Sequence, residues 1–141
     1  MATVKITGLK ELKKDLKKLG EKKALNIMRS GLRSGAATIS KAMKANTPTD
    51  SGDLKRSIGV SKRKTPKTMI KFSVGPRPNL LVTVKGEKKR INAGNYGLNV
   101  EYGTQFQEAQ PFARNTFDQL GVNVTNAITK QIAKKIEKEA N

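Results

Sequence analysis

The 141-residue chain contains no cysteine, no histidine and no tryptophan. Without cysteine it can form neither a disulfide framework nor a thiolate metal site. Without histidine it also lacks the commonest general base and most zinc ligands. It has no phosphate-binding loop, no Ser-x-x-Lys motif in a recognisable frame and no paired carboxylates. The sequence therefore predicts a protein that is not an enzyme and has no catalytic residues, cofactor or metal site.

Apolar residues are also scarce, at 35% of the chain, and the aromatic residues are four Phe and two Tyr. No apolar run approaches the ~20 residues that a membrane-spanning helix needs. The opening Met1–Ile6 lacks the apolar segment of a secretory signal. We therefore expect no membrane association, and the length predicts one domain over residues 1–141 with a modest core.

Acidic residues are few, and the charge is uneven along the chain. Lys and Arg number 29 against 11 Asp and Glu, which gives a net charge of +18. Residues 54–90 are rich in Lys and Arg and contain one acid, Glu87, whereas residues 91–129 contain one basic residue, Arg114. Such a field attracts polyanions or acidic protein surfaces. Lysines that only keep the chain soluble would give the same composition, so both interpretations stay open.

Leucines at positions 9, 12, 16 and 19 predict an amphipathic helix that Gly20 ends. A longer helix is predicted from about residue 22 to residue 45, with an apolar face that includes Leu25, Met28, Leu32 and Ile39. Gly31 and Gly35 make part of its surface thin, so that another backbone can approach closely. The partner in that contact is either the chain's own sheet or a second subunit.

Two segments, 58–60 and 69–74, read as the strands of a hairpin whose basic turn spans residues 62–67. Residues 80–84 predict a further strand or an extended arm. The following segment, 85–90, is too polar to be buried, and residues 91–97 read as a loop. We therefore expect a basic extended loop at about 75–97, and a span of this length tends to be functional or disordered. Its candidates for contact with a partner are Lys85, Lys88, Lys89 and Arg90.

In the next segment, Leu98, Val100 and Tyr102 alternate with polar residues, which predicts a strand with one buried face. Gly103 should end it with a positive φ. Pro111 suits the first position of a helix. Phe112 then begins the apolar face of a long C-terminal helix, in which Gly121 allows a bend, and we expect this side chain to anchor the helix on the core.

Glu101 is the one acid in this expected strand. Its carboxylate could accept N–H bonds from the turn at Gly103 and Thr104, or it could pair with a cation of a neighbouring subunit. It could also be an ordinary outward-facing strand residue. The sequence leaves these three possibilities open.

The segment Glu101-Tyr102-Gly103-Thr104, followed by Pro111-Phe112, resembles the signature of the tail-completion, or head–tail joining, proteins of long-tailed bacteriophages. A second match lies after the long helix, where Gly52, Leu54 and Ser57 are similar to the family's Thr-Gly-x-Leu-x-x-Ser-Ile turn, with Ser51 before the glycine. The resemblance covers roughly residues 1–75 and 96–139. With the expected helices and hairpin, it implies an α+β fold in which a small antiparallel sheet packs against a long helix of the N-terminal half and a long C-terminal helix.

In function, the resemblance implies a structural virion protein that is assembled in the host cytoplasm and forms a ring, expected to be a homohexamer, at the head–tail junction. Its implied partners are further copies of itself, the head connector or adaptor, and the tail tube or tail terminator, with DNA passing through the channel. The alternative is a basic nucleic-acid-binding protein. Against that alternative, the basic stretches lack interleaved aromatic residues for base stacking, and no helix-turn-helix or zinc-finger spacing is visible.

Overall fold

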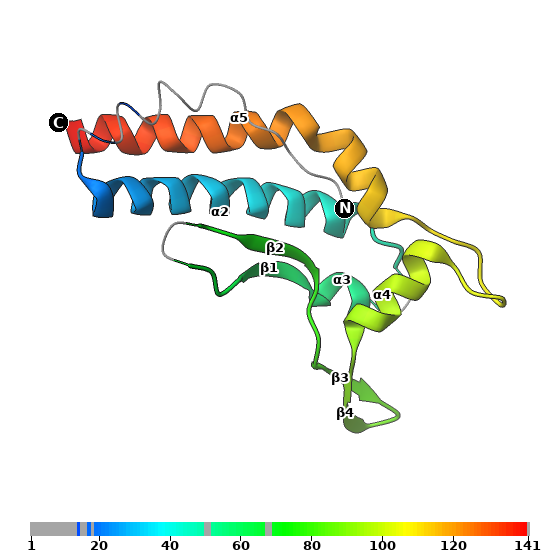
Figure 1. Ribbon diagram of the computed structural model, residues 1–141. Helices are drawn as coiled ribbons and strands as arrows, with labels where there is room; N and C mark the ends of the chain where they lie inside the picture. The colour runs from blue at the N-terminus through cyan, green and yellow to red at the C-terminus, as the bar shows by residue number, and fades with distance from the viewer. Residues whose placement is uncertain (1–13, 15–16, 18, 50–51, 67–68, 141) are drawn as a thin grey trace.

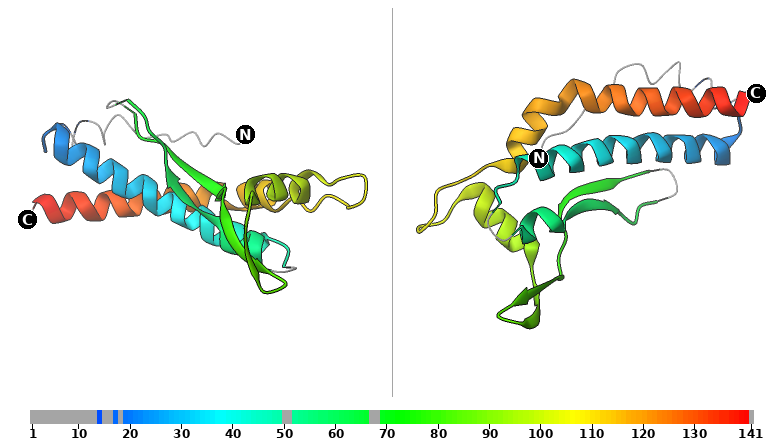
Figure 2. Two further views of the ribbon diagram at one scale, coloured as in Figure 1. Left: turned by 90° about the horizontal axis from the view of Figure 1, so that it is seen from below. Right: turned by 180° about the vertical axis from the view of Figure 1, so that it is seen from behind.

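The computed structural model describes residues 14, 17, 19–49, 52–66 and 69–140. Two long helices, α2 (Glu21–Asn46) and α5 (Phe112–Ala140), lie side by side along most of their length (Figures 1 and 2). A hairpin of β1 (Ile58–Lys62) and β2 (Phe72–Pro76) packs on the other side of α2, which is therefore the middle layer. The predicted α+β class is confirmed, whereas the amphipathic helix predicted at residues 9–19 falls mostly outside the described residues.

The contact between α2 and α5 depends on two glycines of α2. A Cβ atom at Gly35 would lie 2.5 Å from Cγ1 of Ile128, and one at Gly31 would collide with Ile132. The close approach predicted for these glycines is therefore made to α5 of the same chain and not to its sheet. Both glycines are buried beneath α5, so they are not open to a second subunit. The buried side chains of this layer are Ile27, Val124, Ile128 and Ile132.

A second core cluster lies where the remaining elements meet α2. It joins Met43 of α2, Leu54 of the short helix α3 (Asp53–Ser57) and Ile58 of β1 to Val100 of helix α4 (Ala93–Tyr102) and Phe112 of α5. These five side chains are at most 4% exposed. The cluster fixes α4 against the start of α5, which positions the site described below.

The predicted hairpin at residues 58–74 is confirmed, with Ile58 opposite Pro76 and Lys62 opposite Phe72 in an antiparallel register. The basic span that follows it is not the extended loop expected at 75–97. It forms a second antiparallel hairpin, β3 (Leu80–Val84) and β4 (Glu87–Ile91), which projects away from the helices (Figure 1). Its two-residue turn has φ of 51° at Lys85 and 83° at Gly86. Positive φ at both central residues is the geometry that suits the twist of a tight hairpin.

The strand predicted at residues 98–102 is wrong, because this segment is the second half of helix α4. The Asn92 side chain caps the helix by accepting the backbone N–H groups of Gly94 at 3.1 Å and Asn95 at 3.3 Å. The buried positions of α4 are 93, 97, 100 and 101, which is helical spacing. The alternation of apolar residues at 98, 100 and 102 does not describe one face, since Val100 is buried while Leu98 and Tyr102 are exposed.

Candidate functional site

The Glu101 side chain joins α4 to the first turn of α5. Glu101 is only 8% exposed, and its carboxylate accepts hydrogen bonds from the backbone N–H groups of Ala113 at 2.8 Å and Arg114 at 3.0 Å. These N–H groups have no partner inside the helix, and the positive end of the helix dipole favours a carboxylate there. The expectation of backbone N–H donors is therefore correct in kind, but the donors belong to α5 and not to the turn at Gly103.

The loop from Gly103 to Gln110 projects from the end of the molecule as a braced structure. Gly103 has φ of 76°, which confirms the predicted positive φ, although it ends a helix rather than a strand. Thr104 and Gln107 exchange backbone hydrogen bonds of 2.8 and 3.3 Å, and the N–H of Gln110 donates to the carbonyl of Val100 at 2.7 Å. The loop is thus held at both its base and its tip.

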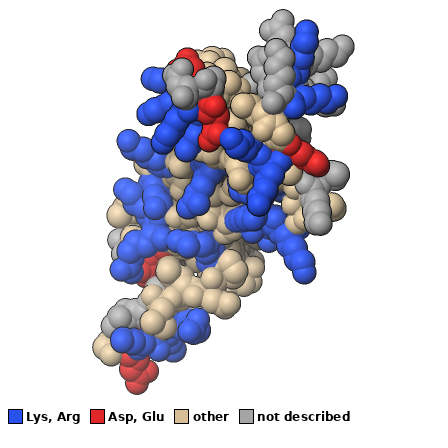
Figure 3. Space-filling model, turned by 90° about the vertical axis from the view of Figure 1, so that its left-hand side faces the viewer, with Lys and Arg blue, Asp and Glu red and all other residues tan. Residues whose placement is uncertain are grey.

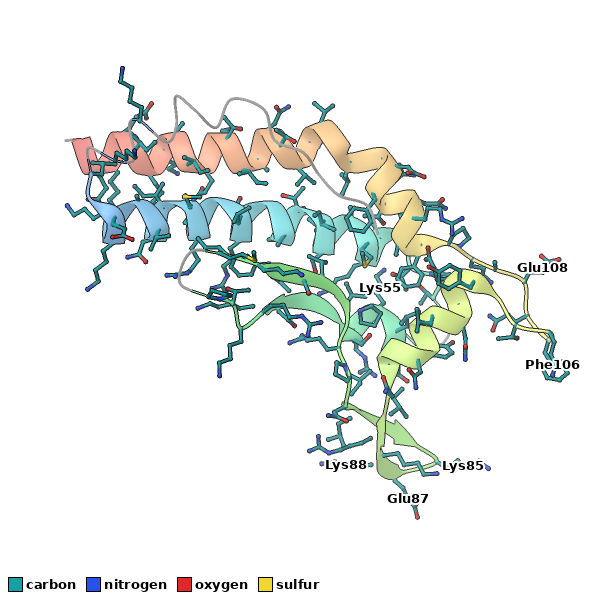
Figure 4. All side chains as sticks on the ribbon, in the orientation of Figure 1. Lys55, Lys85, Glu87, Lys88, Phe106 and Glu108 are labelled. Atoms are coloured by element: carbon teal, nitrogen blue, oxygen red, sulfur yellow. The ribbon has the colours of Figure 1, made fainter. Side chains whose placement is uncertain are left out.

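Phe106 lies at the tip of this loop and is 89% exposed (Figure 4). Its backbone N–H donates to Oγ1 of Thr104 at 3.2 Å, so the backbone is held although the ring touches little. Phe106 is not among the functional residues predicted from the sequence. An aromatic residue inside a short polar loop was the available signal, because such a side chain is costly to leave in water.

Phe112 begins α5 and is 3% exposed, which confirms that it anchors the helix on the core. Pro111 lies just before the helix, where its carbonyl accepts the N–H of Asn115 at 3.4 Å. Thr116, which no sequence pattern indicated, is fully buried one turn later. Its hydroxyl donates to the carbonyl of Phe112 at 2.7 Å and accepts the side-chain amide of Asn46 at 3.0 Å.

The second motif is structural. Gly52 has φ of 80° and precedes α3, so it makes a turn that a residue with a Cβ would strain. Leu54 enters the core cluster, and the buried Ser57 hydroxyl donates to the Leu54 carbonyl at 2.6 Å. The motif therefore determines the conformation of the segment that connects α2 to the first hairpin.

A groove of about 330 Å³ lies between α4 and the start of α5. Leu98 and Tyr102 are 57% and 67% exposed along it, on one face of α4, while Arg114 and Asp118 contribute the charges of α5. Its full lining also includes Pro76, Gly94, Gly97, Glu101, Phe112, Ala113 and Phe117. Both segments of the Glu-Tyr-Gly-Thr and Pro-Phe motif thus contribute to one exposed, largely apolar groove, which suits contact with another protein.

The opposite end of the molecule is strongly basic. Figure 3 shows Lys and Arg over most of the end that carries the start of α2, the end of α5 and the tip of the first hairpin. A shallow groove of about 190 Å³ lies there, and its described lining contains no acidic residue. Its basic residues are Arg29, Lys62, Arg63, Lys64 and Lys71. Nε of Arg29 is buried and has no hydrogen-bond partner among the described residues.

The four basic candidates of the second hairpin lie elsewhere, on its turn and on β4. Lys85, Lys88, Lys89 and Arg90 are all exposed, and Figure 4 shows Lys85 and Lys88 reaching outward from the end of the hairpin. In the described part of the chain, no group of acidic residues is arranged to hold a metal ion. No helix among the described residues is long and apolar enough to cross a membrane.

Comparison with known proteins shows a match to a family model. The model of the HK97-gp10-like family, described as a tail component of bacteriophage HK97, matches residues 10–103, about two thirds of the chain. The matched span includes the Gly52–Ser57 turn and extends to Gly103, at the base of the loop that carries Phe106. Searches of curated proteins and of solved structures found no significant match.

Proposed function

Since this chain belongs to the HK97-gp10-like family of bacteriophage tail components, we propose that it assembles as a ring at the head–tail junction, where it completes the tail and joins it to the head connector. Family membership makes the chain a structural tail protein of the virion. The ring, its expected six copies and its place at the junction form the proposal.

The observation that carries self-assembly is the division of the surface into two ends. Copies with a net charge of +18 repel one another unless they meet where positive charge is low. The end formed by α4, the loop 103–110 and the start of α5 has Arg114 as its one basic residue in the sequence. The same end exposes Leu98, Tyr102 and Phe106. It is therefore the surface on which identical copies can meet with the least electrostatic repulsion.

The second hairpin supports contact with a different protein. It extends beyond the core, and its turn and β4 carry four exposed cations against Glu87. Long-range attraction would guide such an arm to an acidic surface, which we assign to the adjacent head connector or tail tube. Replacing Lys85, Lys88, Lys89 and Arg90 with Ser should leave the melting temperature of the subunit nearly unchanged and stop joining.

The proposed function is tested by complementation of a phage that lacks this gene. Without the protein, we expect tailless heads filled with DNA beside free tails in electron micrographs, and the wild-type chain should restore joined, infectious particles. The variant in which Lys85, Lys88, Lys89 and Arg90 are replaced with Ser should fail to restore these particles. Joined particles formed at normal yield without the protein would contradict a role at the junction.

A second candidate function, binding of nucleic acid, is favoured by the basic groove between Arg29 and the first hairpin. Its five basic residues could contact phosphates of DNA. Direct binding through several phosphates predicts an affinity that falls steeply between low and moderate salt. Replacing Lys62, Arg63 and Lys64 with Ser should then reduce the salt dependence. The same substitutions should leave DNA binding unchanged if the groove instead faces acidic protein.

A further inference from the structure

We propose that Phe106 of one copy inserts into the groove between α4 and α5 of an adjacent copy, and that this contact, repeated from copy to copy, holds the ring together. The inference rests on the proposed function in one respect only, which is that copies of the chain assemble. It assigns a subunit contact to two features of the same chain that do not meet within one molecule.

The first feature is a rigid apolar projection. Phe106 is 89% exposed, yet its loop is held by the paired Thr104 and Gln107 and by the bond from Gln110 to Val100. Because hydrogen bonds already hold the loop backbone, insertion of the ring costs little further backbone entropy, and more of the burial energy appears as affinity. Aromatic residues of this kind dominate the energy of protein interfaces.

The second feature is the groove that would receive the ring. It has a volume of about 330 Å³ and is lined by Leu98, Tyr102 and Phe117 among other side chains. A cavity of about 150 Å³ is enough to bind benzene, so a phenyl ring fits. Phe106 is not among the residues that line the groove of its own chain, and Figure 4 shows it at the outer end of the loop, pointing away from the helices.

Charge favours a second copy as the occupant. Glu108 follows Phe106 by two residues on the same loop, and Arg114 lines the groove. Both side chains are exposed, and neither forms an ion pair within the described part of the chain. Docking of Phe106 would bring Glu108 of one copy toward Arg114 of the next. A pairing of unlike charges at the rim fixes the orientation of such a contact.

The geometry is that of a projection on one surface and a receptor on another. A contact between two different patches leaves one free patch at each end of a growing assembly, and it ends in a ring when the rotation between copies closes. The basic groove at the other end of the molecule takes no part in it. Like charges are therefore kept away from the interface.

Two variants separate the two sides of the contact. Phe106→Ala removes the projection and leaves the groove, whereas Leu98→Lys disrupts the groove and leaves the projection. Both residues are largely exposed, so the subunit should stay folded. Val122→Lys is the matched control, since Val122 is 74% exposed and does not line the groove. The purified full chain is examined by native mass spectrometry and sedimentation over a range of concentrations.

We expect the wild type and Val122→Lys to form assemblies larger than dimers. Each of the other variants alone should weaken association by at least about thirtyfold, as loss of a dominant interface residue does. Mixed together, Phe106→Ala and Leu98→Lys should form a one-to-one pair and nothing larger, because only one working projection and one working groove remain. A wild type that stays monomeric or stops at a dimer, or a Phe106→Ala chain that still forms rings, would overturn the contact.

Charge exchange provides a second readout. Glu108→Arg and Arg114→Glu should each weaken association, and the double variant should recover part of the loss. Lack of any recovery would place these residues apart and overturn the assigned orientation. Failure of the contact is distinguishable from failure of the function. If rings persist without Phe106, the proposed contact is wrong but the role at the junction is unaffected. If rings depend on Phe106 but the phage joins heads to tails without this protein, the contact is supported and the role at the junction is wrong.

Discussion

The carboxylate of Glu101, on α4, accepts a hydrogen bond of 2.8 Å from the backbone N–H of Ala113, at the start of α5. Its other oxygen accepts the N–H of Arg114 at 3.0 Å. One side chain therefore closes the loop of residues 103–110 at its base and satisfies two donors of a helix end. The motif Glu-Tyr-Gly-Thr and the Pro-Phe that follows it are parts of a single cap.

This cap can be tested by changing Glu101. Glu101→Ala leaves two donors of a partly buried helix end without an acceptor, and we expect it to lower the free energy of unfolding by about 1–3 kcal/mol. Glu101→Gln keeps one oxygen acceptor, so its loss should be smaller. Urea denaturation of both variants measures the difference. Equal stability of wild type and Glu101→Ala would show that the cap contributes nothing to folding.

The backbone at Gly103 gives a second prediction. Its φ is 76°, and a Cβ atom there would lie 2.8 Å from the backbone N of Ala109 and 2.9 Å from the carbonyl O of Gln107. Gly103→Val should therefore lower the free energy of unfolding by about 1–3 kcal/mol or more, or it should block assembly. Gly121→Ala is the control, because Gly121 is helical and a Cβ atom there would meet nothing within 4 Å. This substitution should raise the free energy of unfolding by about 0.4–1 kcal/mol. Unchanged melting temperature and assembly in Gly103→Val would contradict the argument.

Phe112 and Phe106 lie six residues apart and should respond in opposite ways to truncation. Phe112 is 3% exposed, and Phe112→Ala should destabilise the subunit by about 3–5 kcal/mol. Phe106→Ala should change stability by no more than about 0.5 kcal/mol, since the ring is 89% exposed. Chemical denaturation of monomeric protein separates the two. A loss below about 1 kcal/mol for Phe112→Ala would place that ring outside the core.

The glycine contact of α2 gives a coupling prediction. In Gly35→Ala, the new methyl group meets Cγ1 and Cδ1 of Ile128, and the overpacking should cost about 1–3 kcal/mol. Ile128→Ala removes those atoms and should cost about 2–5 kcal/mol by itself. In the double variant the methyl group fills part of the space, so the total loss should be smaller than the sum of the single losses. Strict additivity would mean that the two residues do not touch.

Long elements with a clear period could be predicted from the sequence. The helix expected at 22–45 is observed at Glu21–Asn46, and the hairpin at 58–74 is present. Helix α4 could not be predicted, because Gly94 and Gly97 lower helix propensity and the apolar residues at 98, 100 and 102 imitate a strand. Gly97 is there for packing, since a Cβ would lie 2.8 Å from Cγ of Pro76.

In the second hairpin, a strand at residues 80–84 was one of two predictions and is observed as β3, whereas β4 was missed for a different physical reason. Four of the five residues of β4 are exposed, so there is no buried face to produce alternation. The available signal was the pair Lys85-Gly86 between two extended segments, which is the length of a tight hairpin turn. At the candidate site, positive φ at Gly103 and burial of Phe112 followed from local chemistry. The groove and the donors to Glu101 depend on how α4 meets α5, which no local pattern contains.

The position of α2 between α5 and the first hairpin has a consequence for synthesis. The first hairpin follows α2 closely in the chain, so that side can be covered early. The side with Gly31 and Gly35 is covered by Ile132 and Ile128, roughly a hundred residues later. Contacts this distant in sequence form late and slowly. While the ribosome makes the intervening residues, we expect this apolar side of α2 to stay uncovered, and apolar surface exposed in this way is prone to aggregation.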